Sequence, residues 1–258
     1  MGDLDGVWDV ERTGGALPPL SGVRKRIAGD RGVTVARKLP PLQFDVDDLT
    51  LRYRPPVLGL VDELEPVGGG YDGRAVLFGR EVGRFRMRRV PAEEALAEDL
   101  RAQLAKHLDE ALALEAAVGR LLDSAIVNME DEGLRAELQE HRAETDQHGE
   151  RVRARLEALG VAPSVVREAG GVLGMLVRGV VDLTRGERTG RIARDLYAGE
   201  HLEIAAYELI GHVARRAGDD ATAAMAQGNL ADERAMVARL EARWERFAEL
   251  SLREQGLS

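Results

Sequence analysis

The sequence predicts an α+β protein of two domains: a small antiparallel β-sheet or barrel module over residues 1–90, and an antiparallel four-helix bundle with one long crossover over residues 91–258. Three observations predict this fold class. Residues 1–90 hold most of the Pro and Gly residues, and apolar and polar residues alternate there. After residue 91, apolar residues recur every three or four positions. Aromatic residues make up only 4% of the chain, which favours helix over sheet for most of its length.

The N-terminal module is expected to contain about six short antiparallel strands. An alternation of apolar and polar residues runs over residues 33–35, 42–46 and 49–53, as in half-buried strands. Glycines at 68–70 and an Asp-Gly pair at 72–73 are typical of turns. These patterns predict a small sheet or a partly closed barrel.

Near the start of the chain, Gly6-Val7-Trp8 resembles the Gly-x-Trp opening of lipocalin-like barrels. Only three residues carry this resemblance, and residues 1–90 are too few for a full eight-stranded lipocalin. The resemblance implies that Arg86 or Arg88 of the last strand packs on the indole of Trp8. Binding of a small apolar ligand and a docking role are both open interpretations of the module.

A different pattern begins at Pro91, because a proline followed by two acidic residues is typical of a first helical turn. Apolar periodicity then predicts four long helices, over residues 92–129, 132–158, 189–217 and 219–250. A short amphipathic segment is expected over residues 164–185. Tight turns join the helices within each pair. The roughly thirty residues between the second and third helices are enough for a single long crossover.

Titratable residues interrupt the apolar stripe of each predicted helix. They are Glu115 in the first helix, His141, Glu144 and His148 in or beside the stripe of the second, Glu200 and Glu203 in the third, and Glu233 in the fourth. An ionised carboxylate in a bundle core is costly unless it is paired, hydrogen-bonded or bound to a metal. Few basic residues point into this layer, so two divalent or trivalent cations would balance the charge. Ligation by Glu and His with open positions suits iron or manganese better than a structural zinc site.

A second interpretation needs no metal. Glu115 and Glu233 would then be core acids that are hydrogen-bonded to Tyr207, to a histidine or to an arginine. His141 and His148 would equally be core histidines bonded to the same acids.

The helical residues resemble the ferritin-like superfamily, and specifically the stress-associated YciE/YciF family of bacteria. The resemblance covers about residues 100–250 and is carried by Leu114-Glu115, QEHRAET at 139–145, EHLEIAAY at 200–207 and ADE at 231–233. It implies a ferritin-like bundle with a dinuclear metal–carboxylate site, often dimeric, with a connection to oxidative, osmotic or desiccation stress. The expected metal ligands are Glu115, Glu144, Glu200, Glu203, Glu233 and His148, with His141, Gln147 and Tyr207 beside them.

The chain departs from the ferritin ligand pattern at two positions. Gln147 and Met236 stand three residues after Glu144 and Glu233, where the wider superfamily places histidines. His148 lies on the stripe one position later and is available in place of the first missing imidazole, whereas Met236 has no such substitute. This departure weakens the expectation of tight iron binding and of ferroxidase turnover.

The composition of the chain restricts the kinds of partner and site that the protein is expected to have. The net charge of −9 argues against a nucleic-acid role, and the absence of cysteine excludes disulfides and thiolate metal sites. No signal peptide is recognisable, and no apolar run approaches the roughly 18 residues of a membrane helix. A cytoplasmic protein without membrane contact is therefore expected, and the resemblance to the YciE/YciF family implies that it is a homodimer.

Three functions remain open. The first is a dinuclear iron or manganese site for metal handling or for reducing an oxidant such as peroxide, which includes ferroxidase-like activity. The second is a metal-free dimeric scaffold for stress protection. The third is binding of a small apolar ligand by the N-terminal module.

Overall fold

The computed structural model describes residues 4–36, 39–163 and 189–257, so the amphipathic segment expected over 164–185 lies outside the described residues. Contacts divide the chain into two compact units, Met1–Glu98 and Asp99–Ser258. Among the described residues, the first unit holds the strands and the first turns of the first helix, and the second unit holds the rest of that helix and the other helices.

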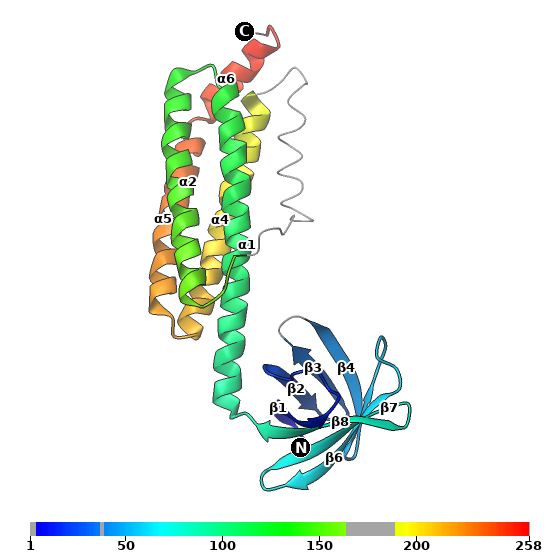
Figure 1. Cartoon of the computed structure of the whole chain (residues 1–258). Helices are drawn as coiled ribbons and strands as arrows, with labels where there is room; N and C mark the ends of the chain where they lie inside the picture. Colours follow the sequence, from blue (N-terminus) through cyan, green and yellow to red (C-terminus); the bar gives the residue numbers. More distant parts are fainter. Residues whose placement is uncertain (1–3, 37–38, 164–188, 258) are drawn as a thin grey trace. The chain divides into compact units, whose positions relative to one another are not determined.

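Eight antiparallel strands form a closed barrel in the first unit (Figure 1). They are β1 (Gly6–Gly15), β2 (Val23–Ala28), β3 (Arg31–Ala36), β4 (Leu39–Asp47), β5 (Thr50–Tyr53), β6 (Leu60–Val67), β7 (Gly70–Leu77) and β8 (Arg80–Arg89). Each strand pairs with the next, and β8 pairs with β1 to close the ring. Two-residue turns at 29–30, 48–49, 68–69 and 78–79 join several of the strands, which keeps the barrel short.

The prediction of about six strands and of incomplete closure was wrong. The alternation of β2 is hidden in the sequence because its inward-facing residues are Lys25 and Ile27, so the strand reads as a basic run. Asp62 has the same effect in β6, since this charged residue also faces inward. A hydrophobic pattern cannot reveal a strand whose buried positions are charged.

Trp8 lies at one end of the barrel, where its indole nitrogen donates a hydrogen bond to the carbonyl of Leu4 at 2.8 Å. The cation above the indole is Arg89, 4.4 Å from the ring centroid, and not Arg86 or Arg88 as expected. Arg86 and Arg88 point outward and pair with surface acids instead, because alternate residues of β8 face solvent.

In the described residues, four long helices and one short helix follow the barrel. They are α1 (Ala92–Asn128), α2 (Glu132–Ala158), α4 (Thr189–Arg216), α5 (Asp220–Glu241) and α6 (Trp244–Glu254). The helix expected over 219–250 is therefore two helices, which corrects that prediction. The chain turns at Ala242 and Arg243, and α6 buries Phe247 in the core. The apolar spacing continues through the turn, so periodicity alone could not reveal it.

The four long helices form a ring in the order α1, α2, α5, α4, with antiparallel neighbours (Figure 1). Side-chain pairs mark the four contacts: Arg142–Asp123 between α2 and α1, His148–Asp232 between α2 and α5, Arg234–Glu208 between α5 and α4, and Tyr207–Glu115 between α4 and α1. α2 and α4 run in the same direction, as in bundles with one long crossover, so the second unit has the ferritin-like bundle architecture (Figure 1). Within the described ranges, no helix combines the length and the apolar character needed to cross a bilayer.

Two apolar clusters fill the bundle. One contains Leu114, Val118, Leu122, Leu138, Leu196, Met236 and Leu240. The other contains Leu104, Leu108, Val152, Leu156, Ile210, Ala226 and Leu230. The titratable residues lie in a layer between these clusters, so water is largely excluded from both sides of that layer.

We expect Asp219→Ala to lower the free energy of unfolding of the bundle by about 1–2 kcal/mol, the usual worth of an N-cap. Asp219 caps α5 by accepting hydrogen bonds from the backbone nitrogen of Thr222 at 2.9 Å and from its hydroxyl at 2.6 Å, and it also pairs with Arg155 at 3.0 Å. Urea denaturation followed by circular dichroism measures the change. Asp220→Ala is the control and should have a smaller effect; equal effects would contradict the capping role.

Candidate metal centre

Six buried side chains from four helices converge in the layer between the apolar clusters. They are Glu115 of α1, His141 and His148 of α2, Glu200 and Glu203 of α4, and Glu233 of α5, none more than 3% exposed. Helical geometry explains why they meet. His141 and His148 lie seven residues apart, which is about two turns, and Glu200 and Glu203 lie three apart, so each pair shares one helix face.

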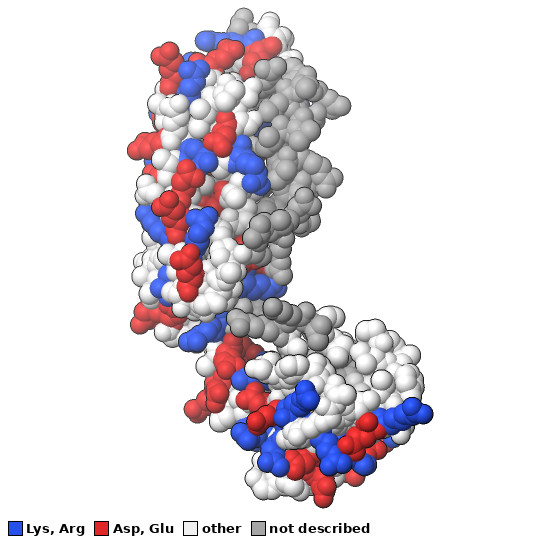
Figure 2. All heavy atoms as spheres, in the orientation of Figure 1, with Lys and Arg blue, Asp and Glu red and all other residues white. Residues whose placement is uncertain are grey.

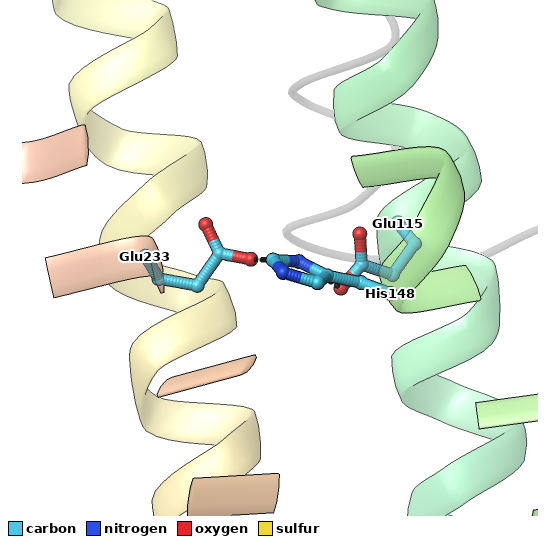
Figure 3. A group of neighbouring side chains, drawn as sticks. All are labelled: Glu115, His148 and Glu233. Atoms are coloured by element: carbon cyan, nitrogen blue, oxygen red, sulfur yellow. Dashed lines mark ion pairs between the residues drawn. The ribbon is translucent and has the colours of Figure 1, made fainter. Parts of the chain in front are cut away.

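Glu115, His148 and Glu233 form the first group of possible ligands, with their ligand atoms within 4.8 Å of one another. Nδ1 of His148 lies 2.7 Å from Oε1 of Glu233 and 3.6 Å from Oε1 of Glu115. Figure 3 shows both carboxylates pointing toward the imidazole from opposite sides. Tyr207 donates a hydrogen bond to Glu115 from α4, which fixes one oxygen of that carboxylate.

A second group of possible ligands, formed by His141, Glu200 and Glu233, lies beside the first. Nε2 of His141 is 3.0 Å from Oε2 of Glu200 and 3.7 Å from Oε2 of Glu233. Glu233 belongs to both groups and turns one oxygen toward each histidine. It is therefore placed as a bridge between two adjacent sites.

Each histidine is held from its outer side by a carboxylate and an arginine. Nδ1 of His141 donates to Glu144 at 3.0 Å, and Arg239 donates to the same oxygen of Glu144 at 3.0 Å. On the other side of the layer, Nε2 of His148 donates to Asp232 at 3.1 Å, and Arg151 of α2 pairs with Asp232 at 3.4 Å. Carboxylates in this position orient a metal-binding imidazole and fix which ring nitrogen carries the proton.

The electrostatic state of the layer follows from its burial. Burial raises the pKa of Glu203 well above its usual range, and the carboxylates of Glu115 and Glu200 raise it further. Burial also raises the pKa of Glu200, to about 7. Burial alone lowers the pKa of both histidines, but the adjacent carboxylates outweigh it and raise the pKa to about 9 for His141 and about 10 for His148. Without a cation, the two imidazolium ions offset part of the negative charge of the layer, and protonation of Glu203 removes more of it.

In the described helices, arginines pair with acids at the surface or at the edge of the layer. Figure 2 shows basic and acidic side chains interspersed over the visible face of the helices. Arg234 pairs with Glu208 and Arg243 with Glu137, and all four side chains are partly exposed. These arginines therefore neutralise acids at the surface of the bundle.

Buried polar atoms without hydrogen-bond partners gather in this layer, among the residues that the structure describes. The clearest are Oε2 of Glu115 and both oxygens of Glu203. Nε2 of His141 and Nδ1 of His148 form ion pairs with Glu200 and Glu233 at 3.0 and 2.7 Å, but these contacts lack the geometry of hydrogen bonds. Such an atom costs about 1–3 kcal/mol if nothing binds it. Carboxylate oxygen and imidazole nitrogen are the donors that dinuclear iron and manganese bundles use. The residues therefore fit a pair of cations.

The expected ligands do not all lie in the two groups. Glu144 is in neither group, since its side chain is 30% exposed and bonded to His141 and Arg239. Glu203 is fully buried beside the groups without belonging to either. Gln147 is exposed and accepts a hydrogen bond from Arg151 at 3.4 Å. Met236 packs in an apolar cluster.

Several residues of the layer were not among the expected ones. Asp232 and Arg239 hold the outer sides of the imidazoles, and Asn229 is fully buried and accepts from Arg151 at 2.9 Å. Thr145 is also buried and donates to the carbonyl of His141 at 3.1 Å. A signal for Asn229 was present, because it lies four residues before Glu233 and so on the same helix face.

Comparison with known proteins agrees with this geometry. Residues 99–252 match the family described as "Domain of unknown function (DUF892)". A solved structure of a Xanthomonas campestris protein is 25% identical, with a TM-score of 0.52, and covers 61% of this chain and 99% of its own. The Desulfovibrio desulfuricans bacterioferritin, described with its diiron site, is 20% identical, with a TM-score of 0.50, and covers 63% of this chain and 90% of its own. No curated protein matches the chain.

The family match covers more than half of the chain, and the bacterioferritin likeness concerns the fold alone. The helical unit has a ferritin-like fold, with a candidate carboxylate and histidine metal site at its centre. The chain belongs to the DUF892 family, whose YciF-like members the motifs at 139–145 and 200–207 resemble.

Proposed function

We propose that the bundle binds two iron or manganese ions. Glu115 and His148 hold one ion, His141 and Glu200 hold the other, and Glu233 bridges them. The observation that supports this most directly is that two groups of buried carboxylate and imidazole ligand atoms lie within 4.8 Å of one another and share one carboxylate, Glu233. Glu203 supplies a further carboxylate at the same depth.

The other residues of the layer position these ligands. Glu144 and Asp232 accept the outer protons of the two imidazoles, which turns Nε2 of His141 and Nδ1 of His148 toward the centre. The hydroxyl of Tyr207 holds one oxygen of Glu115 and leaves the other free. The apolar clusters keep water out, which strengthens every electrostatic interaction inside the layer.

This site would serve in metal handling or in a response to oxidative or general stress. Bound iron or manganese would supply electrons to an oxidant such as peroxide. The donor set favours these metals over a structural zinc ion because carboxylates dominate it. The stress connection and the homodimer come from the resemblance to YciF-like proteins, and both stay predictions, as does the cytoplasmic location.

Elemental analysis tests the proposal. After anaerobic reconstitution of the full chain with Fe(II) or Mn(II) and removal of free metal, we expect about two ions per chain. Failure to retain iron, manganese or zinc would leave a metal-free stress-protection scaffold as the better description. Light scattering on the same samples tests the homodimer separately.

Glu144→Gln separates a positioning role from a ligand role. We expect the variant to keep both ions but to bind them roughly 10–100-fold more weakly, because loss of such an outer carboxylate weakens the imidazole that it orients. Titration with Mn(II) gives both stoichiometry and affinity. Glu150→Gln, an exposed acid of the same helix, should behave like the natural protein. Loss of one whole ion would make Glu144 a ligand.

A further inference from the structure

The β-barrel is filled at one end and hollow at the other. Large buried side chains fill the first end: Trp8, Phe44, Leu51, Tyr71 and Met87. A cavity of about 210 Å³ lies toward the other end, where β1, β3, β5 and β7 finish and the even-numbered strands begin. Its apolar walls include Val10, Leu17, Leu20, Leu42, Leu60 and Phe85. An eight-stranded barrel is just wide enough to hold one small ligand.

Four polar side chains interrupt the apolar wall at one place. Nζ of Lys25 lies 2.7 Å from Oδ2 of Asp62 and 3.2 Å from the hydroxyl of Thr34. The hydroxyl of Tyr53 donates to Asp62 at 3.1 Å and lies 2.8 Å from the hydroxyl of Thr34. All four residues line the cavity, so one polar spot faces an otherwise apolar space. Small-molecule sites usually consist of an apolar pocket with a few precisely placed polar groups.

The charges of this polar spot restrict the ligand. Lys25 and Asp62 are both 4% exposed in their side chains and neutralise each other. Burial lowers the pKa of Lys25, but Asp62 and Tyr53 outweigh it and raise the pKa, so the amine is an ammonium ion and not a nucleophile. A charged ligand would add an uncompensated buried charge, which is costly. The hydroxyl of Thr34, in contrast, can donate and accept hydrogen bonds, and the oxygen of Tyr53 can accept one while its hydrogen goes to Asp62.

The size of the cavity restricts the ligand further. A cavity of roughly 150 Å³ holds benzene, and sites for drug-sized ligands start near 300 Å³. A cavity of 210 Å³ therefore suits one ring with a short substituent, or a short chain. Leu58 and Phe78 are 62% and 78% exposed in the turns at the same end of the barrel. These two residues give the hollow end an apolar rim, which favours contact with an apolar molecule.

We propose that the hollow end of the barrel binds a small neutral molecule with an apolar ring or short chain and a single hydroxyl or carbonyl group. The apolar part lies against the leucines and Phe85. The polar group takes the place of the bond between the two hydroxyls: it accepts a hydrogen bond from Thr34, and a ligand hydroxyl also donates one to the oxygen of Tyr53, whose own hydrogen goes to Asp62. This site is separate from the metal centre and does not depend on it.

Calorimetric titration of the full chain with three matched probes tests the proposal: 4-ethylphenol, ethylbenzene and 4-ethylbenzoate. We expect 4-ethylphenol to bind roughly five- to tenfold more tightly than ethylbenzene, because it adds one buried hydrogen bond. The charged 4-ethylbenzoate should bind most weakly. Equal binding of the first two probes, strongest binding of the benzoate, or no binding of any probe would each overturn the proposal.

Two variants locate the site. Tyr53→Phe and Thr34→Val each remove one hydroxyl, and each should reduce the preference for 4-ethylphenol over ethylbenzene severalfold while ethylbenzene still binds. Tyr71→Phe is the matched control, because it makes the same chemical change at the filled end, away from the cavity. An unchanged preference in both Tyr53→Phe and Thr34→Val, or an equal loss in Tyr71→Phe, would contradict the assignment.

Discussion

Glu233→Ala should abolish metal binding at both sites, whereas Glu115→Ala or His141→Ala should leave about one ion per chain. Glu233 is the one residue common to the two ligand groups, with its oxygens directed at His148 and His141. Its loss removes a ligand from each ion, and each group would keep only two of its three side chains. We expect the affinity for Mn(II) to fall at least 100-fold.

The measurement is elemental analysis together with a Mn(II) titration, on protein whose helical content is first checked by circular dichroism. Glu241→Ala provides the control. Glu241 is an exposed acid of the same helix, bonded only to the hydroxyl of Tyr197 among the described residues, and its loss should leave two ions bound. Retention of two ions by Glu233→Ala would disprove the bridging role.

The second large effect that we expect is that bound metal reverses the pH dependence of the stability of the bundle. In the metal-free protein, the stability of the bundle should fall by several kcal/mol between about pH 5 and pH 9. The raised pKa of Glu200 gives stability that is fully present below its ordinary value of 4.5 and is lost as the pH rises to about 7. The raised pKa values of His141 and His148 give stability that is fully present below 6.5 and is lost as the pH rises to about 9 and about 10. All three contributions have the same sign.

Bound metal should reverse this trend, because protons compete with cations for the same carboxylates and imidazoles. Urea denaturation at several pH values, with a chelator or with saturating Mn(II), measures both curves through the helical circular dichroism signal. Glu203→Gln should flatten the metal-free curve, since it removes a buried acid with a raised pKa. Glu208→Gln, a partly exposed residue of the same helix, should not. Parallel curves with and without metal would contradict the expectation.

The central part of the site could be predicted from the sequence because helical periodicity is a strong signal. Glu115 and Glu233 interrupt long apolar stripes, so their inward direction follows from spacing alone, and both are buried. The second helix was harder, because its buried positions include Thr145 and two histidines, and its apolar stripe is weak. One position on a helix is a rotation of about 100°. Glu144 lies three residues after His141 and four before His148, so it is turned by about 60° and about 40° from them around the helix, which places it at the edge of the layer and the histidines inside it.

The barrel was less predictable, for a physical reason. Pairing between β1 and β8 joins the two ends of the module, and no local pattern encodes such a long-range contact. The buried Lys25–Asp62 pair also replaced apolar residues at the positions that would have revealed two strands. The family match over 99–252 carries no information about this unit.

The two histidines of α2 face the centre through different ring nitrogens, Nε2 for His141 and Nδ1 for His148. Nitrogen NMR distinguishes these two positions of an imidazole by their chemical shifts. Protein labelled with ¹⁵N-histidine therefore carries a separate reporter for each half of the proposed dinuclear centre. Spectra recorded during stepwise addition of a diamagnetic ion such as Zn(II) would then reveal the order in which the two halves fill.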